Sequence, residues 1–174
     1  MADRFIFYNH VLLVIMRLIA IDPGYDKLGY SIFVKEKSTP EYISSGLIKT
    51  SKSQSPGERL LDLHDKLNKV IKENSPDTLA IEKLFFSKNV TTALGVSQSV
   101  GVVLLLAAQQ KMQIIELTPN QIKEIITGYG NSDKKAVQKM LWLQLGREIK
   151  VKDDDESDAI ACGLAACVIN RALI

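Results

Sequence analysis

Residues 16–36, MRLIAIDPGYDKLGYSIFVKE, decide the fold, because they join two strand patterns through one short acidic turn. The first seven residues are largely apolar up to Asp22, and the segment GYSIFVKE alternates between apolar and polar side chains. The segment EYISSGLIKT follows the turn-like KSTP and has strand character too. We therefore expect the domain to open with a meander of three strands joined by short links.

Helix and strand patterns alternate along the rest of the chain. Leucine, valine and isoleucine recur at helical spacing within residues 55–77, which predicts a helix that starts at Ser55 and Pro56, and TLAIEKLFF at 78–86 is typical of a buried strand. Further patterns predict a helix over 89–110, a strand at 112–119, a helix capped by Thr118, a helix capped by Ser132 and a last helix that begins near Asp154. This order predicts an α/β fold with a five-stranded mixed sheet flanked by helices, in which the first, fourth and fifth strands are parallel.

The chain has 174 residues, of which 46% are hydrophobic, and this suits one compact domain with its own core. We divide it into an N-terminal extension at 1–15 and one domain at 16–174, and Met16 could equally be the natural start. Arg17 interrupts the apolar run VLLVIMRLIAI and no small-residue cleavage site follows, which argues against a signal peptide. Two cysteines five positions apart on one helix cannot form a disulfide within it, so a reduced, cytoplasmic protein is expected.

Two acidic residues stand directly after apolar strands. Asp22 ends the first strand before Pro23 and Gly24, and Glu82 is the first charge after the buried run TLAI. In open α/β sheets functional groups collect where strands end, although Asp-Pro-Gly is also a common turn and a strand-end glutamate can reach solvent. A buried acid in either place requires a partner or a cation to offset its desolvation.

The segment VKDDDESDAIACGLAACVI at 151–169 carries five acids in six positions and then continues as a helix of small apolar residues. Asp153 and Asp154 are explained as first-turn acids that cap the helix and complement its dipole. Asp158 resists that explanation, because it lies one turn inside the helix beside small apolar residues, and we expect it to need a cation. Its partner on the same face is Asp155 or Asp154, and the spacing leaves both open.

Acids at two strand ends and two acids on a helix packed across them would form an all-oxygen cluster. Such a cluster suits magnesium or manganese. Two ions about 3.5–4 Å apart can activate a water and stabilise the leaving oxygen of a phosphodiester. The cluster therefore indicates phosphate chemistry.

Five segments, in this order and spacing, resemble the RuvC family of Holliday junction endonucleases, members of the RNase H-like superfamily. The segments are IAIDPGYDKLGYSIF, SSGLIKT, LAIEKLFFSKNVTTALGVSQSVGVVL, TPNQIKEIITGYGNSDKKAVQKML and DDESDAIACGLA, and the resemblance covers Met16 to about Cys167. It implies an RNase H-like nuclease domain and a metal-dependent endodeoxyribonuclease. Such an enzyme resolves four-way DNA junctions by paired symmetric nicks in DNA recombination and repair.

The resemblance also implies a metal site and partners. Asp22, Glu82, Asp155 and Asp158 match the four catalytic, metal-binding carboxylates of the family, which hold two Mg²⁺ ions, or Mn²⁺, in each active site. The family forms a homodimer through the helix that begins near Asn89, in agreement with the lack of charge in this helix. Four-way junction DNA and the branch-migration proteins RuvA and RuvB are the further partners that the resemblance implies, and no membrane is involved.

DNA contacts follow from the same resemblance. Phe85 matches an aromatic residue just after the catalytic glutamate, which resembles a wedge that stacks on bases at the junction centre. Lys123 and Lys134 match lysines that contact DNA near the site. Three further lysines could widen a basic track facing phosphate, although exposed lysines are usually only solvated: Lys88, Lys135 and Lys139.

Two alternatives stay open. A DNA-binding scaffold of the same fold without turnover would be favoured by a missing carboxylate, and all four are present. An RNase H-like nuclease that acts on RNA or on another branched structure is the other alternative. An actin-like ATPase or sugar kinase also places an acid after its first strand, but it needs two such domains and the chain supplies one.

Overall fold

The computed structural model describes residues 5–8, 11–36, 39–83, 90–151 and 153–169. Its strands are β1 (Phe5–Tyr8), β2 (Val11–Asp22), β3 (Lys27–Glu36), β4 (Thr39–Lys49), β5 (Thr78–Glu82) and β6 (Gln113–Leu117). Its helices are α1 (Pro56–Asn74), α2 (Val90–Gln109), α3 (Pro119–Thr127), α4 (Lys134–Leu145) and α5 (Asp154–Ile169).

The sheet has the strand order β4-β3-β2-β5-β6. β3 is antiparallel to both β2 and β4, whereas β5 is parallel to β2 and β6 is parallel to β5. The predicted five-stranded mixed sheet with three parallel strands is therefore confirmed. In addition, β1 pairs with the first residues of β2, with Phe5 opposite Val14, so part of the N-terminal extension forms a hairpin.

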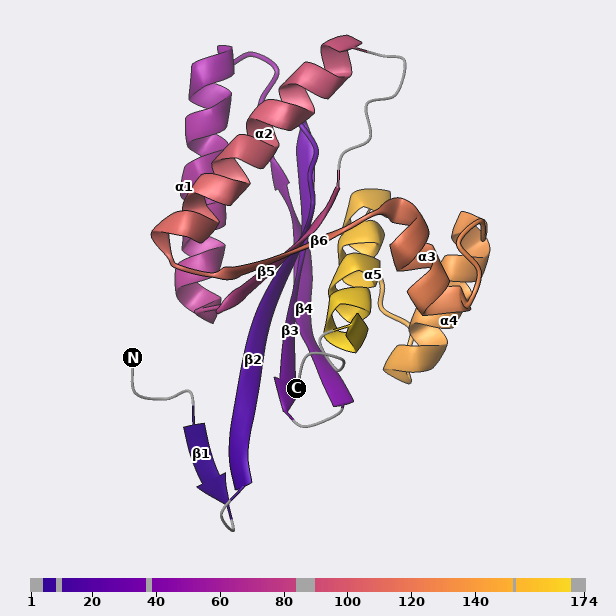
Figure 1. The fold of residues 1–174 in the computed structure, drawn as a ribbon. Coiled ribbons are helices and arrows are strands. Elements are labelled where there is room, and N and C mark those ends of the chain that lie inside the picture. Colours follow the sequence, from indigo (N-terminus) through magenta and orange to yellow (C-terminus); the bar gives the residue numbers. More distant parts are fainter. Residues whose placement is uncertain (1–4, 9–10, 37–38, 84–89, 152, 170–174) are drawn as a thin grey trace.

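Helices cover both faces of this sheet, with α1 and α2 on one side and α3, α4 and α5 on the other (Figure 1). Because side chains alternate along a strand, β2 contributes to both cores. Ile19 and Ile21 pack with side chains of α1 and α2, whereas Leu18 and Ala20 pack with those of α5. The sheet thus separates two cores, one on each side.

The predicted helix starts at Ser55, Thr118 and Asp154 are confirmed. Ser55 and Thr118 each cap a helix in a reciprocal capping box, with Glu58 and Gln121 respectively three residues later. α5 begins at Asp154 as expected. Within the described ranges, no helix has the length and apolar character that a membrane crossing requires.

Three boundaries differ from those predicted. β2 begins at Val11, so the strand continues across Met16 into the preceding apolar run. β5 ends at Glu82, and residues 84–89 lie outside the described ranges. The cap of α4 is Asp133, because its carboxylate accepts from the amide of Ala136, whereas the hydroxyl of Ser132 donates to the carbonyl of Tyr129.

Candidate active site

Asp22 and Glu82 end adjacent parallel strands at the same level of the sheet. Ile21 of β2 is paired with Ile81 of β5, so the two acids are the next residues of each strand. Each acid points to the same side as the residue two positions earlier, and those residues pack in the core beneath α5. Both carboxylates therefore lie on the α5 side, just beyond the end of the apolar core.

α5 approaches the end of β2 through a glycine. Asp22 is paired with Gly29 across β2 and β3, and a Cβ atom at Gly29 would overlap the main-chain carbonyl oxygen of Asp155. One turn further along the helix, the hydroxyl of Ser31 donates a hydrogen bond of 2.8 Å to the carbonyl of Ala159. The first turn of α5 therefore lies over the end of the sheet and brings Asp155 close to Asp22.

Two lysines pair with acids around the first turn of α5. The ammonium group of Lys134, at the start of α4, lies 3.0 Å from a carboxylate oxygen of Asp158 and 3.2 Å from one of Asp154. Lys27, the first residue of β3, donates a hydrogen bond to Asp153. Asp153 and Asp154 therefore each have a lysine partner at the surface, a contact that their predicted role at the helix start did not include.

The remaining negative charge is concentrated where the strands end. Burial, followed by the charges of Glu82, Asp158 and Asp155, raises the pKa of Asp22 to about 8, against the opposing charge of Lys134. Burial and the charge of Asp158 also raise the pKa of Glu82. Burial and neighbouring acids raise the pKa of Asp155. A bound cation would relieve this repulsion.

The donor chemistry fits a hard divalent cation, although the side chains do not yet converge on one point. In the part of the chain that the structure describes, no three His, Cys, Asp or Glu side chains are grouped closely enough to hold an ion. In this arrangement Lys134 forms an ion pair with Asp158. Carboxylate oxygens are nevertheless the ligands that Mg²⁺ and Mn²⁺ prefer.

A cavity of about 200 Å³ opens beside the acids, among α3, α4 and α5. Glu82 and Asp158 line it, and so do the predicted lysines Lys123 and Lys134. Its remaining lining comes mostly from the three helices: Pro119, Ile122, Val137, Gln138, Ser157 and Ala161. The cavity therefore offers acids and cations side by side on a partly apolar wall.

The described cavity lining includes two of the predicted DNA contacts. Lys135 follows Lys134 on α4 but lines a separate, open groove. Phe85 and Lys88 belong to the segment 84–89, outside the described residues.

A buried arginine that the sequence interpretation missed holds the loop after Asp22. Arg59 of α1 donates hydrogen bonds to the carbonyl of Tyr25, the carboxylate of Asp26 and the hydroxyl of Thr50. Its guanidinium also lies 3.9 Å from the centre of the Tyr25 ring. Arg59 lies four residues before Leu63, the first buried leucine of α1, so both side chains are on the same face of the helix. This spacing was the sequence signal that could have predicted a buried arginine.

The Tyr25 ring also contacts α2. A Cβ atom at Gly95 would lie 2.8 Å from this ring, so only a glycine fits there without displacing it. The turn between β2 and β3 is thus held by α1 and α2, while Lys27 at its end holds the start of α5.

A mixed sheet of this strand order, with helices on both faces, is that of an RNase H-like domain, and acids stand at the ends of β2 and β5 and at the start of α5. A family model described as crossover junction endodeoxyribonuclease RuvC matches residues 18–167. The chain therefore belongs to the RuvC family.

Relatives and solved structures agree with this assignment. The crossover junction endodeoxyribonuclease RuvC of Thermosipho melanesiensis is 43% identical over 156 residues, which are 90% of this chain and 99% of the relative. That of Pseudothermotoga lettingae is 39% identical over 156 residues, 90% of this chain and 96% of the relative. The structure of T. thermophilus RuvC in complex with a Holliday junction substrate matches with a TM-score of 0.83 and 26% identity, covering 90% of this chain and 96% of that one.

Proposed function

We propose that this protein is a structure-selective endonuclease that resolves four-way DNA junctions by paired symmetric nicks, in DNA recombination and repair. The observation that carries the proposal is that burial, together with the nearby acids Glu82, Asp155 and Asp158, raises the pKa of Asp22 in a chain of the RuvC family. The solved RuvC that binds a Holliday junction has the same fold over 90% of this chain.

The proposed catalytic residues are Asp22, Glu82, Asp155 and Asp158, which would hold two Mg²⁺ ions, or Mn²⁺, in each active site. When bound, these ions supply an activated water and stabilise the leaving oxygen of the phosphodiester. The raised pKa values of three of the acids support this role, because burial first and neighbouring acids second disfavour their charged forms, which a bound cation would stabilise.

Of the two acids that the spacing left open, we propose Asp155 as the metal ligand. Asp155 lies beside Gly29 and contributes to the raised pKa of Asp22. The side chain of Asp154 is 76% exposed and faces Lys134 at the rim. Cleavage should therefore be lost in Asp155→Asn and retained in Asp154→Asn.

Lys134 and Lys123 are proposed to contact the DNA backbone at the cleavage site. Lys134 pairs with one carboxylate oxygen of Asp158 in this structure, and we propose that Lys134 turns away when Asp158 binds a cation. A phosphate entering the cavity would supply the new partner for this ammonium group. Phe85 is proposed to stack on bases at the junction centre and Lys88 to contact DNA, as the family resemblance implies.

We propose that two copies of the chain form a homodimer through α2. This helix has no charged residue, and Leu94 and Leu105 on it are 63% and 54% exposed. Such a surface is typical of an interface. A dimer would place two carboxylate sites on one junction, as symmetric nicking requires.

The proposed partners and setting follow from the family as well. RuvA and RuvB would move the branch point, and the protein would act in the cytoplasm. We propose residues 16–174 as the nuclease domain and residues 1–15 as an extension of it. The matched family model begins at Leu18, which supports that division.

The test is to incubate the purified protein with a mobile four-way junction and Mg²⁺, with Asp22→Asn as the matched variant. We expect paired nicks at symmetric positions from the natural chain and none from the variant. Junction binding without cleavage by the natural chain, with either Mg²⁺ or Mn²⁺ and on several junction sequences, would instead favour a scaffold.

A further inference from the structure

An open groove lies next to the carboxylate cavity, between α4 and the segment 148–151 that leads towards α5. It has a volume of about 730 Å³, and we call it the lysine groove. Its lining is Lys135, Gln138, Lys139, Trp142, Glu148, Ile149, Lys150 and Val151. We propose that the lysine groove binds the phosphate backbone of the DNA arm that leaves the cleavage site, an inference that rests on the proposed function.

The charge of the groove favours a polyanion. Lys135, Lys139 and Lys150 are exposed, and none of them forms an ion pair with another described residue. Glu148 is the one acid in the lining, so three ammonium groups stand against a single carboxylate. This differs from Lys134, whose charge is already balanced by two acids.

The spacing of the lysines suits a chain of phosphates. Lys135 and Lys139 are four residues apart on α4, so they lie on one face of the helix, about 6 Å apart along its axis. Lys150 approaches from the segment on the other side of the groove. An elongated anion could therefore be held from both walls, whereas a single small anion would use only part of the groove.

The lysine groove is separate from the cavity at the proposed cleavage site but borders it. Gln138 lines both the lysine groove and the cavity that contains Glu82 and Asp158. A strand whose phosphate lies in the cavity would therefore meet the groove on the other side of Gln138. This proximity favours DNA over an unrelated acidic peptide, because the proposed function places DNA in the neighbouring cavity.

Trp142 in the groove lining provides a fluorescence signal for binding. Trp142 is the single tryptophan of the sequence, it is half-buried, and it packs against the core beneath α5 while lining the groove. DNA that enters the groove should change the fluorescence of this one indole.

The experiment measures junction binding by the Asp22→Asn protein in Mg²⁺ over a range of salt concentrations. Lys135→Gln with Lys139→Gln should make the plot of log K against log salt about 1.8 units shallower, because each lost phosphate contact removes about 0.9. Glu148→Gln removes a negative charge from the groove and should therefore tighten junction binding. Junction binding should also shift the Trp142 emission, and the double lysine variant should weaken that shift.

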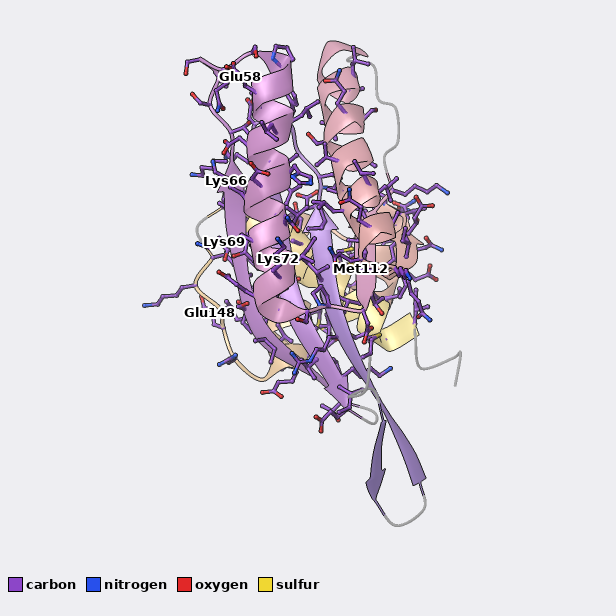
Figure 2. The ribbon with its side chains drawn as sticks, turned by 90° about the vertical axis from the view of Figure 1, so that its left-hand side faces the viewer. Glu58, Lys66, Lys69, Lys72, Met112 and Glu148 are labelled. Atoms are coloured by element: carbon purple, nitrogen blue, oxygen red, sulfur yellow. The ribbon has the colours of Figure 1, made fainter. Side chains whose placement is uncertain are left out.

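The matched control removes two lysines from α1, on the other side of the sheet. Lys69 and Lys72 lie along this helix (Figure 2), and Lys69→Gln with Lys72→Gln should leave the slope unchanged. If the groove variant and this control have equal slopes while the natural chain still cleaves junctions, the groove proposal is overturned and the proposed function stands. If the natural chain neither binds nor cleaves junctions, both are overturned.

Discussion

The two sides of the sheet are packed with different kinds of side chain. Beneath α1 and α2 the core is dominated by leucine, isoleucine and valine. Beneath α5 the helix itself contributes mostly alanine, cysteine and glycine. Large branched side chains keep a helix at a distance, whereas small ones let its backbone approach the sheet. One side thus mainly stabilises the fold, and the other sets the position of acids on α5 against acids on the strands.

On the α5 side, Gly29→Ala should strongly reduce cleavage without removing any of the four acids. The added Cβ would overlap the carbonyl of Asp155, so the first turn of α5 must move away from Asp22. A displacement of about 1 Å in an active site can cost about 100-fold in rate, and we expect a loss of junction cleavage of that order.

The control for that variant is Gly57→Ala on α1. Nothing lies within 4 Å of a Cβ added at Gly57, so cleavage should be unchanged and stability should change by less than about 1 kcal/mol. Equal cleavage rates for Gly29→Ala and Gly57→Ala would contradict the distinction between the two sides.

On the α1 side, Leu67→Ala should lower stability and leave cleavage unchanged. Leu67 is 1% exposed in the branched core, and its truncation should lower the free energy of unfolding by about 2–5 kcal/mol. Cleavage per folded molecule, measured well below the melting temperature, should stay at the natural rate. A parallel loss of specific activity would show that this side also positions the site.

Asp22→Asn should change how stability depends on pH in the metal-free protein. Folding raises the pKa of Asp22 from 3.8 to about 8, so the folded chain retains a proton that the unfolded chain loses between these values. The stability of the natural chain should therefore fall as pH rises from about 4 to 8, and this contribution should be absent in the variant.

Chemical unfolding at pH 4 and pH 8 measures this difference. At pH 8 the variant should be more stable than the natural chain, by about 1.4 kcal/mol for each unit by which folding raises the pKa of Asp22. At pH 4 the two proteins should be equally stable. Mg²⁺ should stabilise the natural chain at pH 8 more than the variant. Identical pH profiles would mean that Asp22 is not buried among acids.

Arg59→Lys should give the smallest loss of cleavage among the variants that reduce it. Arg59 is an exception to the division between the two sides of the sheet, because it belongs to α1 but holds the loop after Asp22. A lysine cannot reproduce its contacts to Tyr25, Asp26 and Thr50. Since partners that orient metal ligands typically contribute 10–100-fold, we expect roughly a tenfold loss of cleavage. Lys72→Gln on the same helix is the control, and a loss in Arg59→Lys no greater than in this control would limit Arg59 to a structural role.

The sequence predicted those features that depend on local patterns. The acids at Asp22 and Glu82 were recognisable because an apolar strand ends at each, and the parallel order of β2, β5 and β6 follows from the crossover connections. Capping residues marked the starts of α1 and α3. The choice of Asp155 over Asp154 came from the family resemblance and stays a prediction.

Features that depend on contacts between distant segments were not predictable. In the sequence, Gly29 looks like an ordinary strand residue. Its role depends on α5, which lies more than 120 residues later in the chain and packs against it. The ion pair between Lys134 and Asp158 likewise requires α4 and α5 to be placed in space. The cap at Asp133 was missed because serine and aspartate stand side by side and are equally good capping residues.

The most direct test of the account is to locate Mn²⁺ by anomalous scattering in crystals of the natural chain. We predict two peaks about 3.5–4 Å apart, in contact with carboxylate oxygens of Asp22, Glu82, Asp155 and Asp158, with Lys134 turned away from Asp158. Active crystals in which Mn²⁺ lies elsewhere, or in which these four acids remain apart with Lys134 still paired to Asp158, would contradict it.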